Sequence, residues 1–341
     1  MKNIFKYPFY FFDLLGAGKS FSQNPVLGNV RLNAWGLHKR RVEIAAAMAD
    51  YRRKRLGRLL DPADREQLSA DGFLVKENYL PAPVFQRLKS EVYSTPFAAR
   101  EMRQGRTVTR MVALGPRVLS TMPETCAFLK DNRLTGMMHY AASCGGEPVS
   151  MLHTIMVDPT VSSTDPQTEL HSDTFHPTAK AWLFLHDVGP EDGPFIYVPR
   201  SHLLTTERLQ WEYQQSLTAR HDPRPHHGYG SFRITPPELQ ALGYVPETVS
   251  VRANTLVVAD TRGFHGRTPS RKSTMRISLD MYLRRSPFLP WNGLDMSSLP
   301  VLKGRSLDLY LAYLDMLEQK LGKKSIWRDV GMVPVDAPAN I

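Results

Sequence analysis

The sequence predicts an all-β core with flanking helices (α+β), built as a sandwich or a barrel. Between about residue 107 and residue 283, short apolar runs rich in β-branched and aromatic residues alternate with clusters of turn residues. Many short strands of this kind are typical of antiparallel sandwiches and barrels. On both sides of this region the apolar residues recur at helical spacing, so helices are expected at both ends of the chain.

The composition is that of an ordinary globular protein. Of the 341 residues, 42% are hydrophobic and 22% are charged, which is sufficient for a sizeable core. The two cysteines, Cys126 and Cys144, exclude a disulfide framework and a Cys-x-x-Cys metal site. A reducing, cytoplasmic location is therefore expected, and any metal would be held by nitrogen and oxygen ligands.

Residues 1–60 are expected to form a basic, aromatic and helical N-terminal extension. They contain twelve Lys/Arg and three Asp/Glu, so nine of the ten net positive charges lie here. Residues 5–15 are apolar but too short to cross a bilayer, which needs about 20 residues. Residues 37–60 show a helical pattern with an apolar face and a basic face.

Two alternatives remain open for this extension. It either lies peripherally against an anionic membrane or packs its apolar face on the core. Membrane contact would use Phe5, Tyr7, Phe9, Tyr10, Phe11, Phe12, Arg40, Arg41, Arg52, Arg53 and Arg55. Nucleic acid is not expected as a partner, because the aromatic start and the apolar stripe favour a membrane surface instead.

The rest of the chain divides into a main domain and a C-terminal segment. Residues 61–300 are expected to form the domain, and residues 301–341 a helix and tail that pack on it. Leucines three or four apart support this helix, at Leu307, Leu311, Leu314, Leu317 and Leu321. Residues 205–247 are polar and loop-rich, which indicates either a lid over a site or a solvent-exposed loop.

A metal site is indicated by His171 and Asp173. In a strand, residues two apart point to the same face, so this imidazole and carboxylate would lie side by side. Such a pair suits a divalent metal that accepts nitrogen and oxygen, with a third ligand from elsewhere. The candidate third ligand is His265, which follows the apolar run at residues 254–260.

An anion site is indicated by Arg276, which begins the next β-run after His265. Arg276 and Ser278 share a face by the same rule, and an arginine can bind a carboxylate through two hydrogen bonds. Two histidines, one aspartate and an arginine placed for a carboxylate are the set that a non-haem Fe(II) oxygenase using 2-oxoglutarate requires.

Four motifs resemble those of the phytanoyl-CoA dioxygenase family of iron- and 2-oxoglutarate-dependent oxygenases. The family's opening turn and strand are matched by SADGFLVKENYL and its iron-binding His-x-Asp by HSD. Its signature loop and strand are matched by VGPEDGPFIYVPRSH, and the strand that delivers the distal histidine by ANTLVVADTRGFHG. Arg276 stands where the family has its 2-oxoglutarate arginine. The resemblance covers residues 68–288 and implies a double-stranded β-helix (jelly roll, cupin-like) with the site in its mouth.

The resemblance also implies residues around the co-substrate. Trp182 falls where family members place a residue lining the 2-oxoglutarate pocket, and His153 and Thr154 lie on a strand that usually lines it from another side. Two positions depart from the family pattern. Arg200 replaces the glycine of a Pro-Gly-Ser-His turn, and Arg267 stands where a small or hydroxyl residue is common. Arg267 would add a second positive group if its side chain enters the site.

Together these features predict a dioxygenase that uses Fe(II), 2-oxoglutarate and O2 to hydroxylate an unactivated C–H bond of a small-molecule or lipid-like substrate, releasing succinate and CO2. The expected metal ligands and catalytic residues are His171, Asp173 and His265. The expected co-substrate residues are Arg276, Ser278, Trp182, Thr154 and His153. Two alternatives remain: a Zn(II)-type metal hydrolase on the same ligands, and a non-catalytic binding protein on an oxygenase fold.

Overall fold

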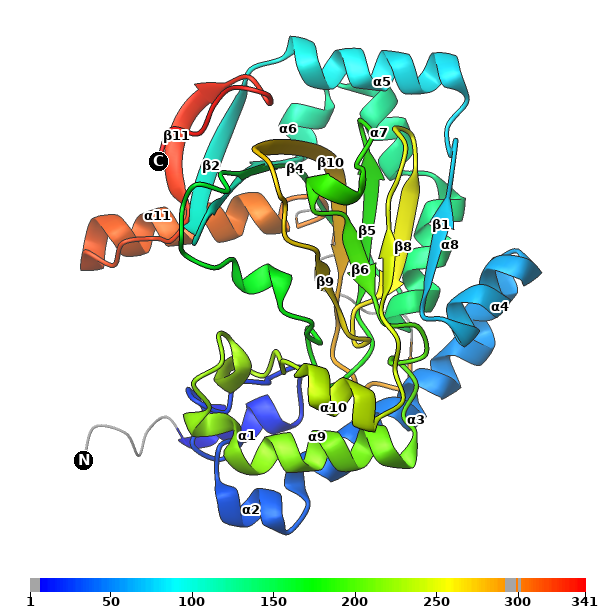
Figure 1. The fold of residues 1–341 in the computed structure, drawn as a ribbon, viewed down its shortest axis with the longest axis vertical. Helices are drawn as coiled ribbons and strands as arrows, with labels where there is room; N and C mark the ends of the chain where they lie inside the picture. Colours follow the sequence, from blue (N-terminus) through cyan, green and yellow to red (C-terminus); the bar gives the residue numbers. More distant parts are fainter. Residues whose placement is uncertain (1–6, 292–298, 300–301) are drawn as a thin grey trace.

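The computed structural model describes residues 7–291, residue 299 and residues 302–341. Within these residues the strands form two antiparallel sheets (Figure 1). The large sheet has the order β1-β8-β5-β10-β4-β3-β2-β11, and the small sheet has the order β7-β6-β9. The strands are β1 (Phe73–Lys76), β2 (Phe97–Gln104), β3 (Thr107–Ala113), β4 (Val149–Val157), β5 (Ala179–Phe184), β6 (Phe195–Tyr197), β7 (Glu247–Val249), β8 (Leu256–Asp260), β9 (His265–Arg267), β10 (Thr274–Leu283) and β11 (Arg328–Val333).

Helices cover the outer face of the large sheet and one end of both sheets (Figure 1). They are α1 (Tyr7–Leu14), α2 (Val30–Ala34), α3 (Leu37–Leu56), α4 (Pro62–Ala70), α5 (Ala82–Ser94), α6 (Pro116–Leu119), α7 (Pro123–Leu129), α8 (Asn132–Ala142), α9 (Thr206–Thr218), α10 (Pro236–Ala241) and α11 (Ser306–Leu321). This is a double-stranded β-helix with flanking helices, so the predicted fold class is confirmed.

Successive side chains of a strand point to opposite faces of the large sheet. One face belongs to the core beneath the helices, and the other faces the space between the sheets. On β5, Ala181 and Leu183 belong to the core shared with α5, α7 and α8. The intervening Trp182 packs instead on the small sheet, with 4.9 Å between the ring centroids of Trp182 and Phe195. The period-two rule therefore places one face of β5 against the helices and the other face toward the candidate site.

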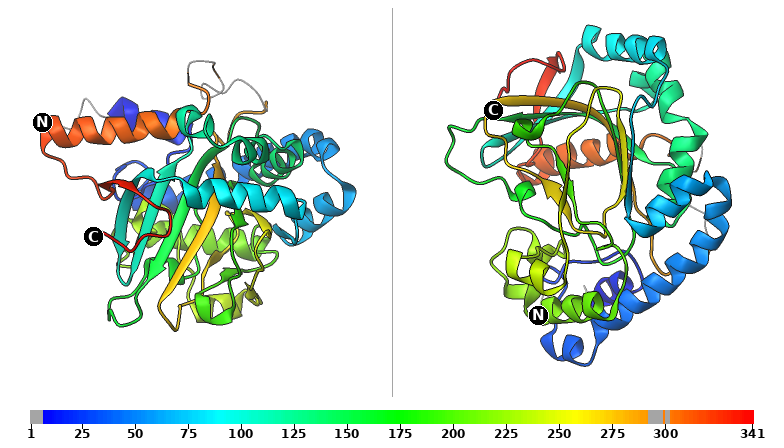
Figure 2. Two further views of the ribbon diagram at one scale, coloured as in Figure 1. Left: turned by 90° about the horizontal axis from the view of Figure 1, so that it is seen from above. Right: turned by 45° about the vertical axis from the view of Figure 1, so that its right-hand side comes forward.

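The N-terminal extension packs on the core from residue 7 onward. Figure 1 and the right view of Figure 2 show α1, α2 and α3 beside α9 and α10 at one end of the sheets. α3 contacts α8 and α9, and it buries Val42 and Ala45 next to Phe175. The structure therefore agrees with the packing alternative for this extension.

Three of the arginines named for the membrane alternative contact protein groups. Arg41 and Arg52 are only 5% and 3% exposed. Arg53 forms an ion pair with Asp260, with 2.7 Å between Nη2 and Oδ2. A buried guanidinium requires protein partners, so the contacts of these side chains do not support the membrane alternative.

The aromatic side chains of α1 lie at the surface. Phe9, Phe11 and Phe12 are exposed, whereas Phe5 lies outside the described residues. Within the described part of the chain, no helix is both long enough and apolar enough to span a bilayer.

Residues 205–247 contain two helices, so the prediction that this segment is loop-rich was wrong. α9 packs on α2 and α3, and α10 begins with a capping box between Thr235 and Glu238. The intervening chain pairs with the segment that carries His171. The amide of Ser172 donates to the carbonyl of Phe232 at 3.0 Å. This part of the segment therefore supports the chain that carries His171 and Asp173.

The C-terminal segment attaches mainly through its backbone. β11 pairs with β2 at the edge of the large sheet. Beyond it, the buried Arg110 donates to the carbonyls of Pro334, Ala337 and Pro338 at 3.0, 2.7 and 2.7 Å. α11 has no fully buried residue, and Leu321 of the expected apolar stripe is exposed. The expected boundary at residues 300–301 lies outside the described residues.

Candidate active site

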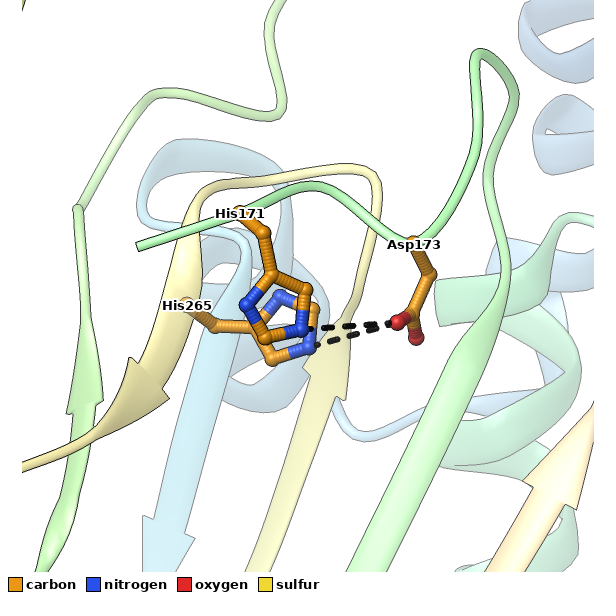
Figure 3. A group of neighbouring side chains, drawn as sticks. All are labelled: His171, Asp173 and His265. Carbon is orange, nitrogen blue, oxygen red and sulfur yellow. Dashed lines mark ion pairs between the residues drawn. The ribbon is translucent and has the colours of Figure 1, made fainter. Parts of the chain in front are cut away.

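His171, Asp173 and His265 lie close together, with their side chains directed toward one another (Figure 3). The chains around His171 and His265 form an antiparallel bridge, in which each amide donates to the other carbonyl at 3.0 and 2.9 Å. The two imidazoles therefore lie side by side, with 4.6 Å between ring centroids. The amide of Asp173 donates to the carbonyl of Thr261 at 2.9 Å, which fixes the chain that presents the carboxylate.

The three side chains present ligand atoms to one point. Asp173 Oδ1 lies 3.8 Å from His171 Nε2 and 3.7 Å from His265 Nε2. Each imidazole donates its Nδ1 proton to a main-chain carbonyl, of Glu169 at 2.8 Å and of Gly263 at 3.0 Å. This leaves both Nε2 atoms as acceptors, and His265 Nε2 is buried without a hydrogen-bond partner. Such a two-nitrogen, one-oxygen set fits a divalent transition metal.

The electrostatic surroundings keep the three groups in the state that binds a metal. Burial, aided by the charge of His265, holds the pKa of His171 well below its ordinary value. Burial also lowers the pKa of His265 to about 4. Burial, the largest single effect, opposes ionisation of Asp173, but the charges of Lys180, His265, His171 and Lys19 together outweigh it and hold the pKa of this carboxyl well below its ordinary value.

A cavity of about 280 Å³ adjoins these ligands between the sheets. It is lined by the two histidines and by side chains from β2, β4, β5, β6 and β10. The predicted site residues that line it are His171, His265, His153, Trp182, Arg276 and Ser278. Lys180, Arg267, Asp280, Tyr282 and Trp327 also line it.

Arg276 is buried and directed into this cavity. Its guanidinium donates to the carbonyl of Gly193, but Nε has no hydrogen-bond partner. Burial, together with the like charge of Arg267, lowers the pKa of Arg276 to about 9. A carboxylate bound here would relieve both effects, because it supplies an acceptor and an opposite charge.

Arg267 enters the cavity as the sequence suggested for this departure from the family pattern. Its Nε donates to Asp165 Oδ2 at 2.8 Å. The same oxygen accepts the hydroxyl of Thr107 at 2.8 Å. Asp165 therefore offsets the charge of Arg267 and leaves Arg276 as the guanidinium without an ion-pair partner at this end of the cavity.

Asp280 is a site residue that the sequence reasoning missed. Its Oδ1 accepts the Ser278 hydroxyl at 2.5 Å, and its Oδ2 accepts the Nδ1 proton of His153 at 2.7 Å. His153 Nε2 is left without a hydrogen-bond partner. An acidic residue two positions after Ser278 in an otherwise apolar run was the available signal, because it must share the face of Arg276 and Ser278.

Thr154 does not lie where the resemblance implied. It follows His153 on β4, so its side chain points to the opposite face of the sheet. There its hydroxyl donates to the carbonyl of Val335 at 2.7 Å. Thr154 therefore holds the C-terminal tail, whereas His153 faces the cavity.

The other departure, Arg200, keeps a glycine-like backbone. Its φ is +68°, in the left-handed region that glycine adopts most readily. The turn before Ser201 and His202 therefore has a conformation that glycine favours, although an arginine occupies the position.

Two lysines beside Asp173 were also missed. Lys180 Nζ lies 2.7 Å from Asp173 Oδ2, and Lys19 Nζ donates to the main-chain carbonyl of Asp173. A single lysine in the apolar run of β5 was a usable signal for Lys180. Lys19 is 154 positions from Asp173, and no local pattern marks it.

Several solved structures are similar to this chain. The epimerase SnoN from nogalamycin biosynthesis shares 19% identity, with a TM-score of 0.41 over 66% of this chain and 84% of that chain. HygX from Streptomyces hygroscopicus shares 16% identity, with a TM-score of 0.40 over 72% of this chain and 94% of that chain. AviO1 from Streptomyces viridochromogenes Tue57 shares 18% identity, with a TM-score of 0.39 over 66% and 95%.

The sequence also matches a family profile. No curated protein matches the chain. The profile of the phytanoyl-CoA dioxygenase family (PhyH) matches residues 68–273, more than half of the chain. This match includes His171, Asp173 and His265, which the structure brings together. The chain therefore belongs to the phytanoyl-CoA dioxygenase family.

Proposed function

We propose that this protein is an Fe(II)- and 2-oxoglutarate-dependent dioxygenase that hydroxylates an unactivated C–H bond of a small-molecule substrate. One observation carries the proposal: the imidazoles of His171 and His265 and the guanidinium of Arg276 line the same cavity, and His265 Nε2 and Arg276 Nε have no hydrogen-bond partner. The cofactors are Fe(II) and 2-oxoglutarate, with O2 as the second co-substrate.

The protein groups bind and orient these components. His171 Nε2, His265 Nε2 and Asp173 Oδ1 are the metal ligands, and the carbonyl partners of the two Nδ1 protons fix the tautomers. Arg276 binds the distal carboxylate of 2-oxoglutarate. When bound, Fe(II) and 2-oxoglutarate supply the oxidation, in which O2 gives one oxygen atom to succinate and the other to the C–H bond, with release of CO2.

Side chains around the co-substrate define its space. Trp182 and Phe195 form an apolar wall between the two sheets. Asp280 holds the imidazole of His153 through Nδ1, so that Nε2 faces the cavity. These groups favour one orientation of a small dicarboxylate and limit the water around it.

The two alternative functions, a Zn(II) hydrolase and a non-catalytic binding protein, explain fewer of these site residues than the oxygenase does. A Zn(II) hydrolase would need the three ligands and a water, but it would have no use for a buried guanidinium beside them. A non-catalytic binding protein would not require two imidazoles whose tautomers are both fixed for coordination. Arg276 and the ordered ligand set therefore favour the oxygenase.

We do not extend the proposal to membrane attachment. Arg41 and Arg52 are buried, which removes part of the basic face that such contact would use. Phe9, Phe11 and Phe12 of α1 are exposed, but exposed aromatic side chains alone do not identify a membrane as the partner. A cytoplasmic location remains our prediction, and the two cysteines, Cys126 and Cys144, which form no disulfide, fit a reducing compartment.

The test is a search for product rather than for one expected substrate. The purified protein is incubated with Fe(II), 2-oxoglutarate, O2 and a small-molecule cell extract, and compounds that become heavier by one oxygen are sought by mass spectrometry. Succinate should form only when Fe(II), 2-oxoglutarate and O2 are all present. Succinate formation with an oxidised product that gains no oxygen would exclude hydroxylation, and no binding of 2-oxoglutarate would exclude the proposed enzyme class.

A further inference from the structure

A segment outside the matched family region closes over the metal-binding side chains. Residues 15–29, the N-terminal strap, connect the end of α1 to the start of α2. The buried guanidinium of Arg41 holds the strap by donating to the carbonyls of Leu14, Gly16 and Gly18, at 3.1, 3.1 and 2.7 Å. Arg41 therefore fixes the path of a segment that has no regular hydrogen-bonded structure of its own.

The strap is also fitted against the segment that follows α9. The amides of Phe21 and Ser22 both donate to the carbonyl of Gly228 at 2.9 Å. Gly230 has a φ of +79°, and a Cβ added there would overlap the carbonyl of Lys19. Only glycine permits this close approach, so the position of Lys19 is set by the contacts on both sides of it.

Lys19 thereby reaches the metal ligand Asp173. Its Nζ donates to the main-chain carbonyl of Asp173, and the residue is only partly exposed. Lys180 lies on the carboxylate of the same aspartate, 2.7 Å from Oδ2, and lines the cavity. Two ammonium groups thus contact one metal ligand from different elements of the fold.

Two guanidinium groups complete a cationic cluster of Lys19, Lys180, Arg233 and Arg284. The charges of the other three members all act on Lys19. Arg233 is buried, bound to Ser231 and 3.7 Å from Glu169 Oε2. Arg284 is exposed, and it donates to the carbonyl of Ala17 in the strap.

The cationic cluster carries more positive charge than its carboxylates offset. Asp173 pairs with Lys180, and Glu169 lies near Arg233. Among the residues that the structure describes, neither Lys19 nor Arg284 forms an ion pair with a carboxylate. A divalent metal on Asp173 would add to the excess, so the surroundings favour an anion.

The cationic cluster is distinct from the arginine assigned to 2-oxoglutarate. Arg276 and Tyr282 both line the cavity on β10. They are six residues apart, which corresponds to about 20 Å along a strand. Tyr282 lies opposite Lys180 in the sheet register. The cavity therefore has the guanidinium groups of Arg276 and Arg267 at one end and the ammonium group of Lys180, beside the metal ligands, at the other.

We propose that the cationic cluster binds an anionic group, a carboxylate or a phosphate, on the substrate, with Lys19 and Arg284 as its direct partners. This inference rests on the proposed function and adds a substrate class to it. Lys180 stays on Asp173 and orients the metal ligand, and Arg233 remains held by Ser231 and Glu169. The N-terminal strap is then a part of the substrate site, because it contains Lys19 and its Ala17 carbonyl accepts a hydrogen bond from Arg284.

The experiment measures anion binding without turnover. The full chain is loaded with Ni(II) and saturated with 2-oxoglutarate, so that the site at Arg276 is occupied. Methylphosphonate and propionate are then titrated by calorimetry as probes for a phosphate and for a carboxylate. We expect at least one probe to bind, and the ratio of the two affinities assigns the anion.

The variants Lys19→Met and Arg284→Met remove the charge and keep an apolar stem. Each should weaken binding of the preferred probe by roughly ten- to a hundredfold, as expected for one charge-assisted contact. The matched control is Arg40→Met, because Arg40 is a highly exposed side chain on α3 that pairs only with Glu43. It should leave probe binding unchanged, and circular dichroism verifies that all three variants fold.

The outcomes separate this inference from the proposed function. If 2-oxoglutarate binds normally but neither probe binds, or if Lys19→Met and Arg284→Met bind the probe as the wild type does, the anionic substrate class is rejected and the oxygenase assignment stands. An equal loss in Arg40→Met would show unspecific charge attraction and also reject it. A wild-type protein that fails to bind 2-oxoglutarate would instead reject the proposed function.

Discussion

Lys180 holds one oxygen of the Asp173 carboxylate, with 2.7 Å between Nζ and Oδ2, while the other oxygen faces the two imidazoles. The ion pair therefore fixes the orientation of the carboxylate in addition to favouring its charged form. A metal ligand held in this way loses little conformational freedom when the metal binds.

The variant Lys180→Met tests this relationship. Loss of the ion pair should raise the pKa of Asp173 toward its ordinary value and leave the carboxylate free to rotate. We expect metal affinity to fall by roughly ten- to a hundredfold, measured by titration of Mn(II) at neutral pH. Lys272→Met, at an exposed lysine that pairs with Asp192, is the control. Equal metal affinity in wild type and Lys180→Met would contradict the positioning role.

The metal ligands make a second prediction. Asp173→Ala and His265→Ala should each abolish succinate formation, because each removes one of three ligand atoms that converge on one point. Both variants should remain folded by circular dichroism, since neither side chain supports the hydrophobic core. Succinate formation by Asp173→Ala at the wild-type rate would remove this residue from the metal site.

Arg276 provides a third prediction. Arg276→Lys should bind 2-oxoglutarate roughly ten- to a hundredfold more weakly than wild type. The lysine ammonium carries the same charge, but it cannot form the two parallel hydrogen bonds that the planar guanidinium donates to a carboxylate. Calorimetric titration of the metal-loaded protein measures this difference. Arg271→Lys is the matched control, because the Arg271 side chain is 79% exposed. If Arg276→Lys and wild type bind 2-oxoglutarate equally, the distal carboxylate lies elsewhere.

Two buried histidines away from the metal ligands predict acid sensitivity. Burial lowers the pKa values of His202 and His227 to about 4 each, whereas an unfolded chain titrates them near about 6.5. Between these values the unfolded state binds more protons, so stability falls as the pH is lowered through this window. Urea midpoints of the metal-free protein should therefore decrease from pH 6.5 to pH 4.5.

A variant separates these histidines from other acid effects. His227→Asn retains an acceptor for the Arg233 amide, which bonds to His227 Nδ1 at 3.0 Å in the wild type, but it does not titrate. Its midpoint should depend less on pH than that of the wild type over the same range. A wild-type midpoint that stays constant or rises on acidification would be incompatible with buried neutral imidazoles.

The contact between Gly230 and the N-terminal strap gives a fifth prediction. Gly230 and Gly243 both have positive φ, +79° and +68°, so an alanine at either position costs about 1–2 kcal/mol in backbone strain. At Gly243 an added Cβ meets nothing within 4 Å, whereas at Gly230 it overlaps the Lys19 carbonyl. Gly230→Ala should therefore lower the urea midpoint more than Gly243→Ala and make the strap more sensitive to proteolysis. Equal effects would mean that the strap does not depend on this contact.

The sequence was sufficient for the fold class and for the residues placed around the metal and Arg276. Arg276 and Ser278 follow the two-residue period of strands on β10. His171 and Asp173 lie together as predicted, but His171 forms only isolated bridges and Asp173 is outside any strand. The order of the motifs supplied His265. The same period shows why Thr154 was misplaced: adjacent residues of a strand point to opposite faces, so His153 and Thr154 do not both line one cavity.

Other features of the structure could not be predicted from sequence patterns near the residues involved. Contacts of Lys19 with Asp173 and of Arg41 with the strap depend on how distant segments pack, and charge patterning alone placed Arg41 in solvent or on lipid. The helices between residues 205 and 247 were obscured by prolines, glycines and polar residues. The capping box at Thr235 and Glu238 was a readable start signal there, as was the N-cap Thr205 followed by Glu207.

Both termini, which the family profile does not include, place a residue beside the cavity or beside a metal ligand. The strap places Lys19 beside Asp173, and Trp327, just before β11, lies on the cavity wall. The metal-binding side chains thus come from the region that the family profile matches, whereas Lys19 and Trp327 come from the termini. Relatives with the same triad and different termini would then diverge in selectivity while conserving chemistry, and grafting termini between them offers a route to exchange substrates.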